Sequence, residues 1–431
     1  MSDASTRNLS APEGVQEIVA RLERAGFETW CVGGAVRDAL LGHPHLDWDF
    51  ATAATPAQVV GVFKRTVPIG VEFGTVGVFD SQGTMHEVTT FRRDVNTDGR
   101  HAVVEFGASL DDDLARRDFT VNAIAYHPKS MELRDPFHGQ IDLKRGLVRA
   151  VGKASERMRE DRLRALRGIR FASRFSFHIE PETWTAIRES ASHMGRLSPE
   201  RVKQELEKTM EQVERPSIAL EWWREAGFLK ELVPSIAAAP VERFAALDFL
   251  PRGEGDLAKG ATLNRLAMLF FGEKESTVAS ATKALRFSNA DSNWIASLSG
   301  ARAELGVTID RELRAGTPAA GDLRRWVARI GRMKTESFFT LNAALWRARL
   351  SVDTDQTIES RLDAVTKSAA EIAFRDPIEI ADLAVDGEDL QKAGIKNGPA
   401  MGKALHALLE KVIDDPALNT NAKLIEIAKT L

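Results

Sequence analysis

Two aspartates one residue apart, Asp47 and Asp49, are the first candidates for chemistry in this chain of 431 residues. If the segment LDWDF at residues 46–50 is a strand, both carboxylates lie on one face and Trp48 and Phe50 lie on the other. Such neighbouring carboxylates repel each other unless a cation lies between them. Their spacing suits a pair of Mg²⁺ ions about 3.5–4 Å apart, as used in nucleotidyl transfer. Two solvated acids on an exposed strand edge would give the same pattern.

A pair of glycines precedes these acids. In the segment CVGGAVRD at residues 31–38, Gly33 and Gly34 stand between a predicted strand and a predicted helix, where backbone amides can approach an anion. Arg37 follows in the first helical turn, with a guanidinium group that can fork onto a phosphate. The chain has no P-loop motif, and a plain strand–helix turn is the alternative interpretation. Cys31 is interpreted as a small buried strand residue rather than a nucleophile.

A third segment is strongly basic. Residues 144–174 contain 11 Lys and Arg against three acids, a local charge of +8 in a chain whose formal charge is −4. We predict one helix over residues 159–174, on which side chains three residues apart form a polar stripe, namely Asp161, Arg164, Arg167 and Arg170. A solvated helix with ion pairs is the alternative, although the preference for Arg over Lys favours phosphate binding.

Taken in order, these segments resemble the motifs of the tRNA nucleotidyltransferase/poly(A) polymerase family, in particular its bacterial-type (class II) CCA-adding members. The first motif is GGAVRDALLG followed by LDWDFATAATP. The later motifs are LARRDFTVNA at residues 114–123, DPFHGQIDL at 135–143 with RAVG at 149–152, EDRLR at 160–164, and LSPER at 197–201 with Glu205 and Glu207.

The resemblance implies roles for particular residues. It implies that Asp161 and Arg164 read the Watson–Crick edge of the incoming base, because a carboxylate accepts from the amine of C or A and a guanidinium donates to ring acceptors. Four further roles follow from it: Asp47 and Asp49 as Mg²⁺ ligands and catalytic residues; Gly34, Arg37 and Arg117 as triphosphate ligands; Arg167 and Arg170 as nucleotide contacts or braces of the reading pair; and Asn122 as an ordering residue. Glu87 is a candidate third acid.

The implied activity is addition of C, C and A to the 3′ end of tRNA from CTP and ATP, without a nucleic-acid template and with release of pyrophosphate. The implied partners are the tRNA 3′ end and elbow together with CTP and ATP; no membrane and no stable protein partner are expected. Two residues depart from the family pattern: Phe73 stands where histidine is usual, and His138 where glycine is common. The alternatives are CC-adding, A-adding or poly(A) polymerase activity, and more remotely a non-catalytic RNA-binding protein.

The elements that must position these residues fall into two regions. Short strands and helices alternate up to about residue 140, including strands over residues 29–32, 47–51, 74–79, 86–91 and 103–106 and a turn at residues 96–100. Helical periodicity dominates from about residue 153 onward. We therefore predict an α+β fold: a nucleotidyltransferase-type head with a mixed sheet (residues 1–145), then a helical neck (146–213), body (214–350) and tail (351–431), the tail binding tRNA.

Composition limits the remaining function classes. With 58 Lys and Arg against 62 Asp and Glu, the chain is no general polycation, so a nucleic acid must bind a local patch. One cysteine excludes a disulfide framework and a cysteine-rich zinc site. The polar N-terminal segment lacks the apolar stretch of a signal peptide, and we expect a cytoplasmic protein.

Overall fold

The computed structural model describes residues 9–43, 47–97, 102–350 and 356–430. Within it the chain divides into two compact units. The first unit comprises Met1–Glu205 with Trp222–Leu232, and the second comprises Leu206–Glu221 with Val233–Leu431. The division between them falls within α9 (Pro199–Gln212) and again within α10 (Pro216–Glu225). The predicted four-part division into head, neck, body and tail stays a prediction.

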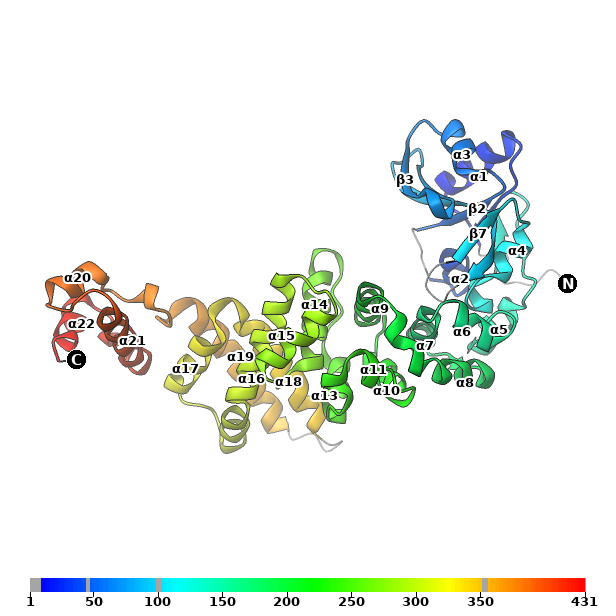
Figure 1. Ribbon diagram of the computed structural model, residues 1–431. Helices are drawn as coiled ribbons and strands as arrows, with labels where there is room; N and C mark the ends of the chain where they lie inside the picture. The colour runs from blue at the N-terminus through cyan, green and yellow to red at the C-terminus, as the bar shows by residue number, and fades with distance from the viewer. Residues whose placement is uncertain (1–8, 44–46, 98–101, 351–355, 431) are drawn as a thin grey trace. The chain divides into compact units, whose positions relative to one another are not determined.

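The first unit is built on a seven-stranded mixed sheet with the strand order β3-β4-β5-β2-β1-β8-β9 (Figure 1). Strands β2 and β5 are parallel, and the other neighbouring pairs are antiparallel. The strands of this sheet are β1 (Thr29–Val32), β2 (Asp49–Thr52), β3 (Thr66–Gly70), β4 (Thr75–Phe79), β5 (Met85–Thr90), β8 (Ala125–His127) and β9 (Glu132–Arg134). The predicted mixed sheet of the head is confirmed.

Helices flank this sheet. Helices α1 and α3 pack against each other and against the sheet (Figure 1). The Arg21 guanidinium of α1 donates to the Val62 carbonyl of α3. Thr55 caps α3 through a capping box with Gln58, as its Thr-Pro start predicts. The helices of this region are α1 (Glu13–Arg24), α2 (Gly34–Leu40), α3 (Pro56–Val62), α4 (Leu110–Ala115) and α5 (Gly139–Arg145).

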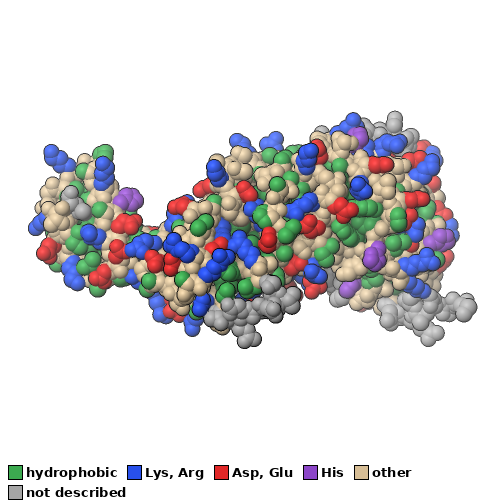
Figure 2. Space-filling model, turned by 90° about the horizontal axis from the view of Figure 1, so that it is seen from below, with side chains coloured by type: hydrophobic (Ala, Val, Ile, Leu, Met, Phe, Trp, Pro, Cys, Tyr) green, Lys and Arg blue, Asp and Glu red, His purple; other side chains and the backbone are tan. Residues whose placement is uncertain are grey.

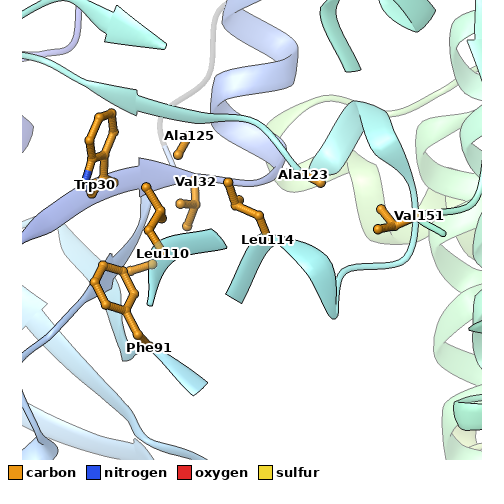
Figure 3. Close-up of a cluster of buried hydrophobic side chains, with 9 residues drawn as sticks. Trp30, Val32, Phe91, Leu110, Leu114, Ala123, Ala125 and Val151 are labelled. Atoms are coloured by element: carbon orange, nitrogen blue, oxygen red, sulfur yellow. The ribbon is translucent and has the colours of Figure 1, made fainter. Parts of the chain in front are cut away.

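A buried cluster joins α4 to one face of the sheet (Figure 3). It contains Trp30 and Val32 of β1 together with Leu110 and Leu114 of α4. Its remaining members are Ala51, Phe91, Ala123, Ala125 and Val151. The cluster fixes α4, and the segment that follows it, beside the carboxyl end of β1.

A separate hairpin follows the sheet. Strands β6 (Arg92–Thr97) and β7 (Ala102–Phe106) pair antiparallel. Part of the turn predicted at residues 96–100 lies outside the described residues.

The remainder of the first unit is mainly helical, as predicted. Two short parallel strands, β10 (Leu147–Val148) and β11 (His178–Ile179), are an addition that the sequence did not predict, because two-residue strands carry no periodicity. The helices are α6 (Ala154–Glu160), α7 (Leu163–Phe175), α8 (Pro181–Glu189) and α11 (Phe228–Leu232).

One prediction about this region is wrong. Residues 159–174 are not one helix, because α6 ends at Glu160 and α7 begins at Leu163. Asp161 between them is extended, with φ −147° and ψ 108°. Its Oδ1 atom accepts from the Leu163 amide at 3.0 Å, so the carboxylate supports the start of the second helix.

The second unit is helical throughout its described residues (Figure 1). Its C-terminal helices enclose a cluster of their own, which includes Leu390, Met401, Leu408 and Leu424. Helix α10 (Pro216–Glu225) is shared between the units, and the other helices are α12 (Pro234–Ala237), α13 (Val241–Ala245), α14 (Ala258–Phe270), α15 (Glu275–Ala284), α16 (Asn289–Ala315), α17 (Ala320–Ile330), α18 (Thr335–Arg349), α19 (Gln356–Arg375), α20 (Gly387–Lys392), α21 (Pro399–Asp414) and α22 (Asn421–Ala428).

No helix among the described residues is long and apolar enough to cross a membrane. On the face shown in Figure 2, Lys and Arg side chains are interspersed with Asp and Glu. This mixture agrees with the near-balanced charge of the whole chain.

Candidate active site

Asp49 is the first residue of β2 and Asp47 lies two residues before it, and the burial of this segment alternates as predicted. Trp48 and Phe50 are buried, whereas Asp47 is exposed and Asp49 is half-buried. Asp49 is paired with Val32 of β1 across the sheet. The apolar side chains of this segment therefore anchor it in the core while both carboxylates remain on the other face.

A third acid belongs to this group. Phe50 pairs with Val88 in the parallel β2–β5 ladder, which places Glu87 beside Asp49. Burial, followed by the charges of Asp47 and Glu87, raises the pKa of Asp49 to about 7 against the lowering effect of Arg117. The repulsion expected between neighbouring carboxylates is thus present at Asp49.

The donor set fits a hard divalent cation. Mg²⁺ is usually bound through one or two carboxylates together with substrate phosphates, rather than by a complete protein cage. Among the described residues, no group of three or more His, Cys, Asp or Glu lies close enough to hold a metal ion. Asp47 and Asp49 supply two carboxylates, and Glu87 adds negative charge beside them.

Gly33 brings the triphosphate candidates close to the acids. It is the residue between β1 and α2, with a left-handed φ of 78°, which favours glycine. A Cβ atom at Gly33 would lie 3.0 Å from the Arg117 Nη1 atom and 3.8 Å from the Asp49 Oδ2 atom. The absent side chain therefore lets Arg117 and Asp49 approach the same point of the backbone. Gly34 follows as the first residue of α2.

Hydrogen bonds to nearby residues of the same segment orient the Arg117 guanidinium. Its Nη2 atom donates to the buried Asp113 carboxylate at 3.1 Å, and its Nη1 atom donates to the Asn122 carbonyl at 3.4 Å. Asp113 also accepts two hydrogen bonds from Arg116. The sequence analysis did not assign a role to Asp113, although acids and arginines four residues apart often pair at the end of a helix.

Arg37 is buried rather than open to a ligand. Its Nε atom donates to Asp38 at 2.8 Å, and its Nη1 atom donates to the Asn122 side chain at 2.5 Å. Its guanidinium also lies over the rings of Phe171 and Phe175, 4.8 and 4.7 Å from their centroids. The triphosphate role of Arg37 stays a prediction, and the contacts support an ordering role between α2 and α7.

Asp118 is the centre of a network that the sequence analysis missed. The Arg167 Nε atom donates to its Oδ2 atom at 2.8 Å, and the Asn122 side chain donates to its Oδ1 atom at 2.9 Å. Burial alone would raise the pKa of Asp118, but the Arg167 charge, these hydrogen bonds and the Arg164 charge lower it to about 2. Asn122 joins Asp118 to Arg37, in agreement with the ordering role expected for it. The signal available was the acid inside the motif LARRDFTVNA.

Of the candidate base-reading residues, Asp161 lies in the break between α6 and α7 and Arg164 lies in the first turn of α7. Asp161 accepts from Arg201 at 2.7 Å. Arg164 donates to Glu160 at 2.6 Å and to the Arg116 carbonyl at 2.9 Å. Arg164 therefore connects the start of α7 to the residue next to Arg117. The two candidate readers are close in the chain, but each has its own partner.

Arg170, the last member of the predicted stripe, forms an ion pair with a carboxylate of the same chain. Arg170 is buried and donates to both Glu205 oxygens, at 2.8 and 3.3 Å. Its guanidinium lies 4.5 Å from the Phe171 ring centroid, and that of Arg167 lies 5.2 Å from it. These contacts support the bracing role that was one of the two expected for Arg167 and Arg170.

A cavity elsewhere in this unit does not contain the predicted residues. It has a volume of about 520 Å³ and is lined by residues of β9 and α5, among them Arg134, His138 and Lys144. His138 has a left-handed φ of 60°, a conformation that favours glycine, which agrees with the glycine common at this position in the resembling family.

Paired carboxylates on a mixed sheet, an arginine beside them and an arginine-rich helix define the class of protein as a nucleotidyltransferase. The family model described as the poly A polymerase head domain matches residues 29–149, and that described as the probable RNA and SrmB-binding site of polymerase A matches residues 176–239. A third, described as tRNA nucleotidyltransferase domain 2, matches residues 325–428.

Individual relatives identify the family within this class. The chain is 34% identical over 431 residues to a CCA-adding enzyme of Limosilactobacillus fermentum, covering 97% of each chain. It is 46% identical over 204 residues to a CCA-adding enzyme of Streptococcus mutans, covering 46% of this chain and 50% of that protein. The chain therefore belongs to the family of CCA-adding enzymes.

A solved structure agrees with this assignment. The crystal structure of the Bacillus stearothermophilus CCA-adding enzyme in complex with CTP superposes with a TM-score of 0.74 at 29% identity, covering 99% of this chain and 98% of that one. The predicted family and fold class are confirmed.

Proposed function

We propose that this protein adds C, C and A to the 3′ end of tRNA, using CTP and ATP and releasing pyrophosphate, without a nucleic-acid template. The observation that carries the proposal is the full-length identity of 34% to a CCA-adding enzyme, together with the retained carboxylate pair of Asp47 and Asp49. The loss of either acid would be expected in a non-catalytic RNA-binding relative. The predicted cytoplasmic location stays a prediction.

In this proposal Asp47 and Asp49 hold Mg²⁺. When bound, the cation supplies positive charge that favours ionisation of the primer 3′-hydroxyl and stabilises the leaving pyrophosphate. Glu87 increases the negative charge at the site. The raised pKa of Asp49 supports the assignment, because a carboxylate held among like charges gains most from a cation.

The remaining residues bind and orient the nucleotide. Arg117, positioned by Asp113 beside Gly33, is our candidate for the triphosphate, together with the backbone of Gly34 and with Arg37. The ordered network of Asp118 and Asn122 keeps this segment rigid, which favours a productive geometry.

Base selection is assigned to Asp161 and Arg164, with Arg167 and Arg170 as braces. Asp161 already accepts from Arg201, but a carboxylate has about four acceptor positions and can also accept from the exocyclic amine of C or A. U and G present a different pattern on that edge and would leave polar groups unpaired, which is costly in a partly dry site. In this proposal the side chains of Asp161 and Arg164 select the base in place of a nucleic-acid template.

The test is a primer-extension assay. Purified protein is incubated with Mg²⁺ and a tRNA transcript lacking CCA, with CTP alone, ATP alone or both, beside a transcript ending in CC. We expect two residues added with CTP and three with both nucleotides. Extension that stops at two, or that occurs only on the CC-ended transcript, would assign CC-adding or A-adding activity; long adenylate tails would assign poly(A) polymerase activity.

A further inference from the structure

The sheet of the first unit carries a group of exposed apolar side chains outside the site described above. Six of them have exposed fractions between 39% and 46%. They are Val67, Ile69, Val71, Phe73, Met85 and Phe106, and we call them the apolar platform. They come from β3, the turn after it, β5 and the end of β7.

The register places Val67, a member of this platform in β3, on the same face as the acids. Gly77 of β4 is the Cα partner of Glu87 on one side and of Val67 on the other. Glu87 in turn lies beside Asp49. Neighbouring strands are about 4.8 Å apart, so β3 lies about 14 Å from β2 across this face. Successive stacked bases are about 3.4 Å apart, and the distance corresponds to about four nucleotides.

Two glycines let side chains of the platform pack against the backbone. A Cβ atom at Gly77 would lie 2.7 Å from the Ile69 Cδ1 atom and 3.1 Å from the Met85 Sδ atom. A Cβ atom at Gly74 would lie 2.6 Å from the Phe106 Cε1 atom. Ile69 and Met85 therefore lie against the backbone of β4, and Phe106 lies against Gly74, the residue before β4, while all three side chains remain exposed. The members of the cluster around α4 that belong to strands of this sheet come from β1, β2 and β8.

The edge of the sheet argues against one occupant, a second copy paired through β3. Pro68 stands in that edge strand, and proline in an edge strand opposes pairing with another chain. Cationic side chains border the platform. The exposed Arg65 lies over the Phe79 ring at 4.0 Å, and Arg92 donates to the Phe73 carbonyl. Apolar side chains with arginines beside them suit bases with their phosphates.

We propose that the apolar platform binds the unpaired bases at the 3′ end of the RNA primer, with Ile69, Met85 and Phe106 as its centre. This inference rests on the proposed function, because the 3′-hydroxyl must reach Asp47 and Asp49 and the preceding bases must lie within a few nucleotides of them. Stacking on apolar and aromatic side chains tolerates any base, which suits an end whose sequence changes as it grows.

The test compares the triple variant Ile69→Ser, Met85→Ser, Phe106→Ala with the full-length wild type. The control is Val60→Ser, Ile141→Ser, which removes exposed apolar side chains from α3 and α5 in the same unit. The substrate is a tRNA ending in CC with 2-aminopurine at the nucleotide before them, so that binding is read by fluorescence quenching as well as by turnover.

We expect the KM for this tRNA to rise at least fivefold in the triple variant, with quenching reduced and the KM for ATP changed less than twofold. The slope of log affinity against log salt should stay the same, since no phosphate contact is removed. The control variant should match the wild type in each measurement.

Unchanged tRNA affinity and quenching in the folded triple variant would overturn the inference. So would the loss of a wild-type dimer in sedimentation with tRNA affinity retained, because the platform would then belong to a second copy. An active wild type with an unaffected triple variant refutes only the platform, whereas a wild type that extends no tRNA refutes the proposed function as well.

Discussion

Two carboxylates in the same unit, Asp49 and Asp118, have opposite surroundings. Burial and the charges of Asp47 and Glu87 raise the pKa of Asp49 to about 7. Asp118 is also buried, but the Arg167 charge and the hydrogen bonds from Asn122 and Arg167 lower its pKa to about 2. The charge of Asp118 is balanced by arginines of the protein, whereas the two acids beside Asp49 outweigh the one arginine near it. The comparison separates an acid that orders the fold from one that is suited to a cation.

The largest expected effect is on catalysis at the acid pair. Asp47→Ala and Asp49→Ala should each reduce nucleotide addition at least about 10⁴-fold, because each removes a carboxylate from the proposed cation site. Binding of tRNA in a filter assay should be nearly unchanged. Asp111→Ala, an exposed acid of α4, is the control and should keep wild-type turnover. Retained turnover in both single variants would remove the metal assignment.

The second expected effect is on stability at Asp118. Asp118→Ala leaves the Arg167 guanidinium, whose side chain is 33% exposed, and the buried Asn122 amide without their carboxylate acceptor, and such a loss costs about 1–3 kcal/mol. The pKa of Asp118 is lowered, so its contribution to stability is present above about pH 4 and is lost as the pH falls towards 2. Urea unfolding of the wild type and the variant at pH 7 and pH 3 measures the loss of stability and its dependence on pH. An equal loss at the two pH values would contradict the charge argument.

The third prediction reverses this pH dependence at Asp49. A raised carboxyl pKa makes the ionised group unfavourable in the folded state, so its contribution is favourable below about pH 4 and is lost as the pH rises through 7. Without Mg²⁺, Asp49→Asn should therefore stabilise the protein at pH 8, on the order of 1–3 kcal/mol, and have little effect at pH 4. Thermal unfolding with and without Mg²⁺ measures this. If Asp49→Asn is less stable than the wild type at pH 8, the ionised Asp49 carboxylate stabilises the fold, as that of Asp118 does, and the prediction is wrong.

The smallest expected effect is on base choice. Arg164→Ala should increase misincorporation of UTP or GTP by about tenfold, because the donor to the base edge is lost, while tRNA affinity changes less. Competition assays with mixed nucleotides measure this ratio. Arg174→Ala is the matched control, since Arg174 lies on the same helix and pairs with Asp38. Unchanged selection in Arg164→Ala would contradict its reading role.

The local patterns of the head were predictable from the sequence. Alternation in β2 placed Trp48 and Phe50 in the core with Asp47 and Asp49 opposite, and the left-handed backbone of Gly33 matches the predicted strand–helix turn. Both features depend on residues adjacent in the chain. For this reason both features could be predicted from the local sequence.

Long-range partners were not predictable in this way. The break at Asp161 interrupts a segment that is otherwise a good helix former, so propensity gave no warning. Arg170 finds Glu205 35 residues later, and Arg167 finds Asp118 49 residues earlier. A stripe of arginines indicates an anion, but only the tertiary structure distinguishes a bound nucleotide from a carboxylate of the same chain.

The most direct test of the central claim is metal specificity at Asp49. In Asp49→Cys the proposed ligand becomes a soft thiolate, which prefers metals such as Cd²⁺ to Mg²⁺. Addition to a tRNA lacking CCA is measured with Mg²⁺ alone and with added Cd²⁺, beside the wild type and Asp49→Ala. The account predicts that Asp49→Cys is inactive with Mg²⁺ and partly restored by Cd²⁺, while Asp49→Ala is not. Full activity of Asp49→Cys with Mg²⁺ alone would contradict it.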